Sequence, residues 1–137
     1  MPAESTDGLS RMRARIEQFW QELDGEFGLL DHAGAAQALN GFAGEPARLH
    51  EKGALLAVDR HGNLRYPGFQ FEGGRSRAMI SDLITLGRRY DLSDADIVMW
   101  LCVPTTYLRQ EDRPVDHLAN EPDLVLKIAA AAWGVEW

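Results

Sequence analysis

Apolar side chains in the first thirty residues recur at intervals of three and four, with arginine and glutamate between them. This spacing predicts a helix that begins after Ser10 and ends near Gly25 or Gly28. Its apolar face fits the core of the protein, but large aromatic residues are also favoured in interfaces, so a dimer contact is a second interpretation. We assign residues 1–28 to this helix. The candidate dimer residues are Phe19, Trp20 and Phe27.

The segment 29–75 carries the signals of two short helices followed by a hairpin. Asp31 is suited to cap a helix over 32–39, and Pro46 is suited to the first turn of a helix over 45–51. The β-prone runs 54–58 and 64–66 flank a turn that contains glycine and asparagine, which predicts a hairpin. Helix, turn, helix and two-stranded wing is the order of a small winged helix-turn-helix module, and such modules often bind DNA.

Basic residues of this module are candidates for DNA contacts. Arginine suits guanine edges and phosphates because its donors form a rigid fork. Glu45 and Glu51 lie on the same predicted helix and would repel phosphate, so the basic residues also fit a solvated scaffold, and the module has the features of a degenerate one. Both interpretations stay open. The candidate DNA-binding residues are Arg48, His50, Lys52, Arg60, His61 and Arg65.

The last part of the chain, 76–137, predicts short helices separated by loops. Gly73-Gly74 is a plausible joint before it. A helix begins at Arg77, and Ser93 with Asp96 resembles a capping box for a second helix, which Pro104 ends. Arg113–Leu118 forms another short helix, and a final helix begins near Asn120 and ends at Gly134. We therefore expect a mainly α protein: a small helical bundle with one β-hairpin.

Charge and composition restrict the function classes. The chain has 137 residues and a net charge of −7, which argues against non-specific binding to nucleic acid. Residues 31–75 hold five basic and five acidic side chains, so a local basic face is still possible. No apolar run approaches the roughly 18 residues that span a bilayer. The polar, acidic N-terminus and single cysteine lead us to expect a cytoplasmic protein without membrane association.

The sequence offers little support for catalysis. His32, His50, His61 and His117 lack the spacing of a zinc site, and no glycine-rich phosphate loop occurs. A nucleophile, base and orienting acid can be assembled only on paper from Cys102, His117 and Asp116, and Cys102 lies in an apolar run that predicts burial. We therefore expect a protein that is not an enzyme and that needs no cofactor or metal.

The C-terminal third carries a more specific pattern. Trp100-Leu101, Pro104 and Leu108 precede the run Arg113-Pro114-Val115-Asp116-His117-Leu118 and a final helix. The chain here resembles the toxin-binding region of Xre/MbcA/ParS-type antitoxins, well over 76–137 and moderately over 53–71. Members of that family usually carry a glycine between the leucine and Arg-Pro, whereas residues 109–112 of this chain contain none.

The resemblance implies an antitoxin of a type II toxin–antitoxin system. Its partner would be a RES-domain toxin that degrades NAD⁺, and its C-terminal region would cover the toxin's active site. Secondary hypotheses are regulation of its own promoter through operator DNA and a homodimer within a larger complex. The alternatives are a stand-alone DNA-binding regulator and a non-enzymatic adaptor. The candidate toxin-binding residues are Ala131, Ala132, Trp133, Gly134, Val135, Glu136 and Trp137, together with Arg113.

Overall fold

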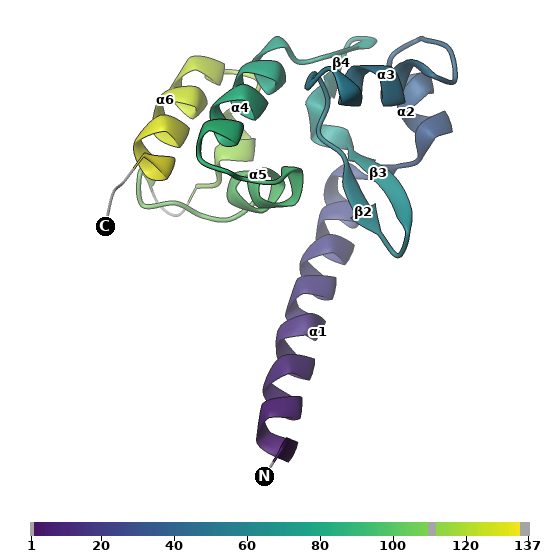
Figure 1. The fold of residues 1–137 in the computed structure, drawn as a ribbon. Coiled ribbons are helices and arrows are strands. Elements are labelled where there is room, and N and C mark those ends of the chain that lie inside the picture. The colour runs from purple at the N-terminus through teal and green to yellow at the C-terminus, as the bar shows by residue number, and fades with distance from the viewer. Residues whose placement is uncertain (1, 110–111, 135–137) are drawn as a thin grey trace.

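The computed structural model describes residues 2–109 and 112–134, with side chains from residue 8 onward. Within these ranges the chain is mainly α, with six α-helices and small antiparallel sheets, which confirms the expected class. Helix α1 (Pro2–Phe27) extends away from the rest of the chain (Figure 1). Two short helices and a small sheet lie on one side of its inner end, and a bundle of the later helices lies on the other.

The segment that we expected to form a winged module, called the winged half from here on, contains β1 (Leu29–Leu30), α2 (His32–Ala38), α3 (Glu45–Glu51), β2 (Val58–Arg60) and β3 (Asn63–Pro67). The three strands form an antiparallel sheet in the order β1-β3-β2. Asp31 caps α2 as predicted, because its Oδ1 accepts a hydrogen bond from the Gly34 N–H at 2.8 Å. A small core beneath the helices contains Ala35, Leu55, Ala57 and Tyr66.

Two predictions for this half were wrong in detail. The first strand of the hairpin begins at Val58 rather than Ala54, because the fully buried Leu55 and Leu56 form an irregular connection into the core. Gly73-Gly74 is not a joint. It forms the turn between β4 (Phe71–Glu72) and β5 (Arg75–Ser76), a second hairpin, and both glycines have positive φ. The short helix η1 (Gly68–Gln70) connects β3 to β4.

The C-terminal bundle contains α4 (Ala78–Arg89), α5 (Asp94–Leu101), the 3₁₀-helix η3 (Pro114–His117) and α6 (Pro122–Trp133). The predicted capping box is confirmed: the Asp96 N–H donates to Ser93 Oγ, and the Ser93 N–H donates to Asp96 Oδ2. Helix α6 begins after Glu121 rather than Asn120. Ile80, Leu83, Ile97 and other apolar residues of α4, α5 and α6 form the main core.

Helix α1 joins the main core only through its C-terminal half. Trp20 and Leu23 are buried there, and Phe27 makes an edge contact with Phe69 at 5.5 Å between ring centroids. At this junction the Gly68 N–H donates to the Gly28 carbonyl, and a Cβ on Gly68 would collide with the Phe27 carbonyl oxygen. The three candidate dimer residues therefore pack on this chain's own core, Trp20 fully and Phe19 and Phe27 in part. No helix among the described residues has the length and apolar character to cross a membrane.

Candidate protein-binding surface

Aromatic side chains gather where α6 ends. The rings of Trp100 on α5 and Trp133 on α6 meet edge to face, with 5.0 Å between their centroids, and both are half-buried. Gly87 on α4 lies beside this pair: a Cβ there would collide with Ile97 Cδ1 at 2.6 Å and would be in van der Waals contact with Trp133 Cζ3 at 3.7 Å. The position of Trp133 is therefore fixed by three helices.

Tyr90 completes this group. Its side chain is 41% exposed and follows α4, and its hydroxyl oxygen lies 3.0 Å from the position that a Cβ on Gly134 would take. We call Tyr90, Trp100 and Trp133 the aromatic end of the bundle. Tyrosine and tryptophan combine a large apolar area with a polar atom and are enriched at the energetic centres of protein interfaces. Val103 and Tyr107, after α5, are also exposed.

Part of the predicted toxin-binding set lies at this aromatic end. Ala131 and Gly134 are exposed, and Ala132 and Trp133 are half-buried. Val135, Glu136 and Trp137 fall outside the residues that the structure describes. The exposed side of the last turn of α6 is therefore available to a partner, while the ring of Trp133 is shared between its own bundle and the surface.

Arg113 has a different place. Its guanidinium donates to both carboxylate oxygens of Glu26 at 2.8 and 2.6 Å and to Asp116 Oδ1 at 2.9 Å, and it lies over the Phe27 ring. These contacts lower the pKa of the Glu26 and Asp116 carboxyls, mainly through the hydrogen bonds from Arg113. Arg113 therefore fastens η3 to α1 rather than standing free for a toxin.

The Arg-Pro-x-Asp-x-Leu pattern is thus explained by folding. Arg113 and Asp116 bind each other across one turn, and Pro114, Val115 and Leu118 are buried. Each position in the pattern either closes the 3₁₀-helix or enters the core. The motif identifies a local structure, and it does not by itself identify a binding surface.

The structure does not assemble the nucleophile considered from the sequence. Burial raises the pKa of the Cys102 thiol to about 12, so the thiol is protonated at neutral pH. Both ring nitrogens of His117 are engaged, Nδ1 with Glu121 at 2.9 Å and Nε2 with Asp112 at 3.1 Å. His117 therefore has no nitrogen left to activate Cys102. The described residues also contain no cluster of three or more His, Cys, Asp or Glu that could hold a metal.

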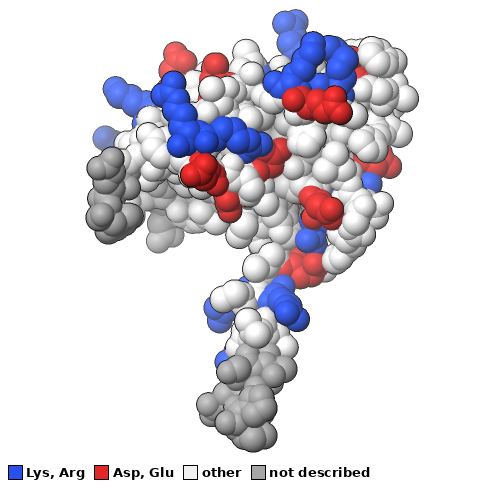
Figure 2. All heavy atoms as spheres, viewed as in Figure 1, with Lys and Arg blue, Asp and Glu red and all other residues white. Residues whose placement is uncertain are grey.

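The candidate DNA-binding residues are mostly paired with acids. Arg48 binds Glu45 at 2.7 Å, and His50 lies 3.2 Å from Asp94. On the wing, Arg60 binds Glu17 of α1 at 2.6 Å and lies over the Trp20 ring, while His61 is 3.5 Å from the same glutamate. Figure 2 shows the same mixture, with basic and acidic groups side by side on the face in view.

Two of the six candidates remain without an acidic partner. Among the described residues, no ion pair involves Lys52, which is exposed, or Arg65, which is half-buried. Lys52 is the C-terminal cap of α3, and Arg65 lies on β3. The winged half therefore offers far less free positive charge than its sequence suggested.

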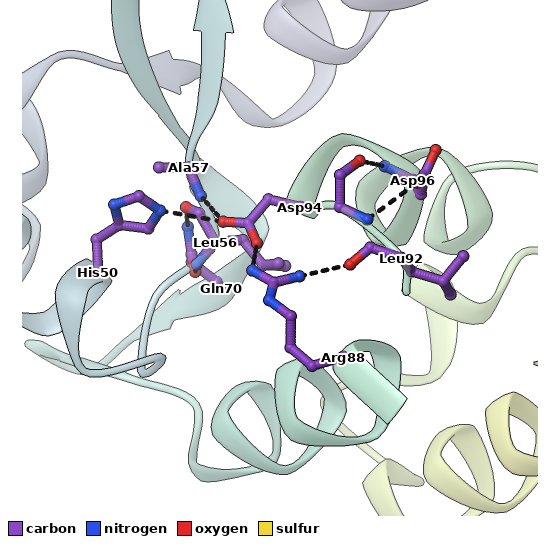
Figure 3. Close-up of polar contacts among 9 residues, drawn as sticks. His50, Leu56, Ala57, Gln70, Arg88, Leu92, Asp94 and Asp96 are labelled. Carbon is purple, nitrogen blue, oxygen red and sulfur yellow. Dashed lines mark hydrogen bonds and ion pairs between the residues drawn. The ribbon is translucent and has the colours of Figure 1, made fainter. Parts of the chain in front are cut away.

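Asp94 joins the two halves and was not predicted. It stands at the start of α5 and is only 8% exposed. Its carboxylate accepts hydrogen bonds from the Ala57 N–H at 3.0 Å and from Arg88, and it meets His50 Nε2 (Figure 3). Beside it, the buried Gln70 side chain accepts from the Leu56 N–H and donates to the Leu56 carbonyl. In the sequence, Asp94 is recognisable only as an acid in a first helical turn, which is a weak signal for such a role.

A surface hollow of about 570 Å³ lies between the β4–β5 hairpin and the first turns of α4 and α6. Met79, Leu118 and Leu126 give it an apolar lining, and its polar lining mixes Arg75 and Arg77 with carboxylates. None of the residues predicted as functional from the sequence lines it. Its mixed charge does not select one class of ligand.

The fold resembles that of a solved protein. The NMR structure of Rv2175c matches with a TM-score of 0.69 and 26% sequence identity, over 78% of this chain and 82% of that chain. No family model matches the sequence, and no curated protein matches it either. The likeness therefore supports the mainly α fold with small antiparallel sheets.

Proposed function

We propose that this chain is the antitoxin of a type II toxin–antitoxin pair. It neutralises a RES-type, NAD⁺-degrading toxin by covering the active site of the toxin with its C-terminal region. The observation that carries the proposal is the aromatic end, where Tyr90 and the Trp100–Trp133 pair surround the last turn of α6. An aromatic surface whose side chains are already packed can fill a concave site, because it supplies contact area at little cost in side-chain entropy.

The same arrangement explains how inhibition works without bond chemistry. The contact of Trp133 with Trp100 holds the end of α6 against the bundle, so these side chains lose little freedom when a partner binds. The toxin is silenced because its NAD⁺ site is occupied by protein.

The test is co-expression with the neighbouring reading frame, with cell growth and intracellular NAD⁺ as readouts. We expect the full chain to restore growth and NAD⁺, and a chain that ends at Ala132 to fail. Tyr90→Ala removes an exposed ring without touching the core and should weaken neutralisation, whereas Phe42→Ala, at a 64% exposed ring in the α2–α3 connection, should not. Equal effects of the two alanine variants, or a harmless neighbour, would refute the proposal.

A second function, DNA-binding regulation, is favoured by the winged order of α2, α3 and the β2–β3 hairpin. Lys52 and Arg65 are its best supported contacts. Replacing both by glutamate should abolish binding to DNA from upstream of the gene, measured by fluorescence anisotropy, and should spare toxin neutralisation. Lys127→Glu, on the exposed side of α6, is the matched control. If the double variant binds the DNA as well as the unaltered chain, this second function is wrong.

A further inference from the structure

The outer half of α1 presents an apolar face that the chain leaves uncovered. Leu9, Met12 and Ile16 are 54%, 59% and 41% exposed, and none of them belongs to a core cluster of the described residues. Figure 1 shows this part of α1 standing clear of the two halves. A single helix without packing is marginally stable in water, so this segment gains most from a partner that covers it. We call these three residues the α1 stripe.

The α1 stripe continues into the body of the protein. Its spacing of three and four runs on through Phe19 and Leu23, which is the repeat of a helix that pairs with another helix. At that level the structure has a small notch of about 60 Å³, lined on α1 by Phe19, Glu22, Leu23, Glu26 and Phe27, and on its other side by Cys102 and Arg113. A surface made of an exposed ridge followed by a notch on the same helix face can complement a copy of itself.

The distribution of charge along α1 favours a second copy of this chain as the partner, with the two helices antiparallel. Residues 8–16 hold three arginines and no acid, and residues 17–26 hold four acids and no base. Two parallel copies would set arginines beside arginines, whereas antiparallel copies set the basic half of each beside the acidic half of the other. Such an arrangement has two-fold symmetry, so both contacts form together and the assembly closes.

We infer that this chain forms an antiparallel homodimer through α1, in which the α1 stripe of each copy packs against the partly exposed Phe19 and the rim of the notch of the other. In this register Ile16 lies beside Phe19 of the partner subunit and Arg15 lies beside Glu22 of the partner subunit. Glu22 has no basic partner within the described part of its own chain, whereas Glu17 and Glu26 are already held by Arg60 and Arg113. The inference is independent of the proposed function.

Sedimentation equilibrium tests the dimer. At chain concentrations up to about 100 µM we expect a mass near twice the 15.3 kDa of one chain. Met12→Glu places an unpaired charge in the interface and should weaken association by roughly 30-fold or more. Ala14→Glu adds the same charge on another side of the helix and should have a much smaller effect. A monomeric unaltered chain, or equal effects of the two variants, would overturn the inference.

A charge swap tests the direction of the helices. Arg15→Glu and Glu22→Arg should each weaken the dimer, and the double variant should restore it, because the opposite charges again face each other. In a Cys102→Ser background, a chain with Arg15→Cys should cross-link to one with Glu22→Cys. Self-linking of Ile16→Cys chains, without that mixed product, would show a parallel pair and overturn the antiparallel arrangement. Circular dichroism confirms that each variant keeps its helices.

Discussion

The winged half and the C-terminal bundle differ in what their charged and aromatic side chains contact. In the winged half, Arg48, Arg60 and His50 contact acids of their own chain, so charges that could meet a ligand hold the protein together. In the bundle, polar contacts hold the helices in place, while Tyr90 and the rim of the tryptophan pair face outward. This contrast is why we assign binding of a partner protein to the bundle first.

The contrast also shows that residue type alone does not reveal a binding surface. Arg60 on the wing looks free in the sequence, but Glu17 lies 43 positions earlier and reaches it because α1 passes beside the hairpin. Trp133 looks like a core residue, but it lies in the last turn of its helix, where the bundle covers it only in part. For both residues, the surroundings of the side chain decide whether it is available to a partner.

Removing Asp94 should have the largest effect, because it breaks the buried polar link between the two halves. Asp94→Ala leaves the buried Ala57 N–H without an acceptor and removes the anion between His50 and Arg88. We expect a loss of about 2–4 kcal/mol in the free energy of unfolding, measured by urea denaturation. Asp96→Ala, which removes only the capping box two residues later, should cost about 1 kcal/mol. Equal losses would show that Asp94 acts as a cap and not as the link.

Arg113→Ala should have the next largest effect, because it removes the ion pair that links η3 to α1. The variant loses the paired hydrogen bonds to Glu26 and the bond to Asp116, and both carboxylates lose their cation. All three side chains are partly exposed, so we expect a loss of only about 1–2 kcal/mol. Thermal unfolding measures it. Arg89→Ala, on an exposed side chain at the end of α4 with no described ion pair, should change stability by less than about 0.5 kcal/mol.

The sequence predicted the local features of the fold. Asp31 and Ser93 cap the helices that they were expected to cap, because a cap is decided within four residues. The strand β1 was missed, since two residues carry no periodic signal and pair only because β3 lies beside them. The helix of the run 113–118 was predicted, but its 3₁₀ geometry was not.

The candidate site was less accessible to prediction. Trp133 was named from the family resemblance, whereas Tyr90 and Gly87 join it only through the packing of α4 against α6. The pairing of Arg60 and Arg113 with α1 depends on contacts 43 and 87 positions apart, which no local pattern encodes. Arg60 and Arg113 therefore remain only predicted contacts to DNA and to a toxin, and in the structure both side chains bind acids of α1.

The smallest predicted effect is a pH dependence of stability that comes from His117, between η3 and α6. Hydrogen bonds to Glu121 and then Asp112 raise the pKa of His117 above its usual value of about 6.5. The folded chain therefore binds this proton more tightly than the unfolded chain does. The resulting stabilisation is fully present below about pH 6.5 and is lost as the pH rises through the folded pKa.

His117→Gln removes this titration while keeping a polar side chain. Between about pH 6 and 8, the free energy of unfolding of the unaltered chain should fall relative to that of the variant, by less than about 1 kcal/mol because both acids are half-exposed. Thermal unfolding of the two proteins across this range gives the difference directly. If the difference is constant or grows with pH, the ion pairs of His117 do not form in solution. The bundle would then hold α6, and with it the aromatic end, by apolar packing alone.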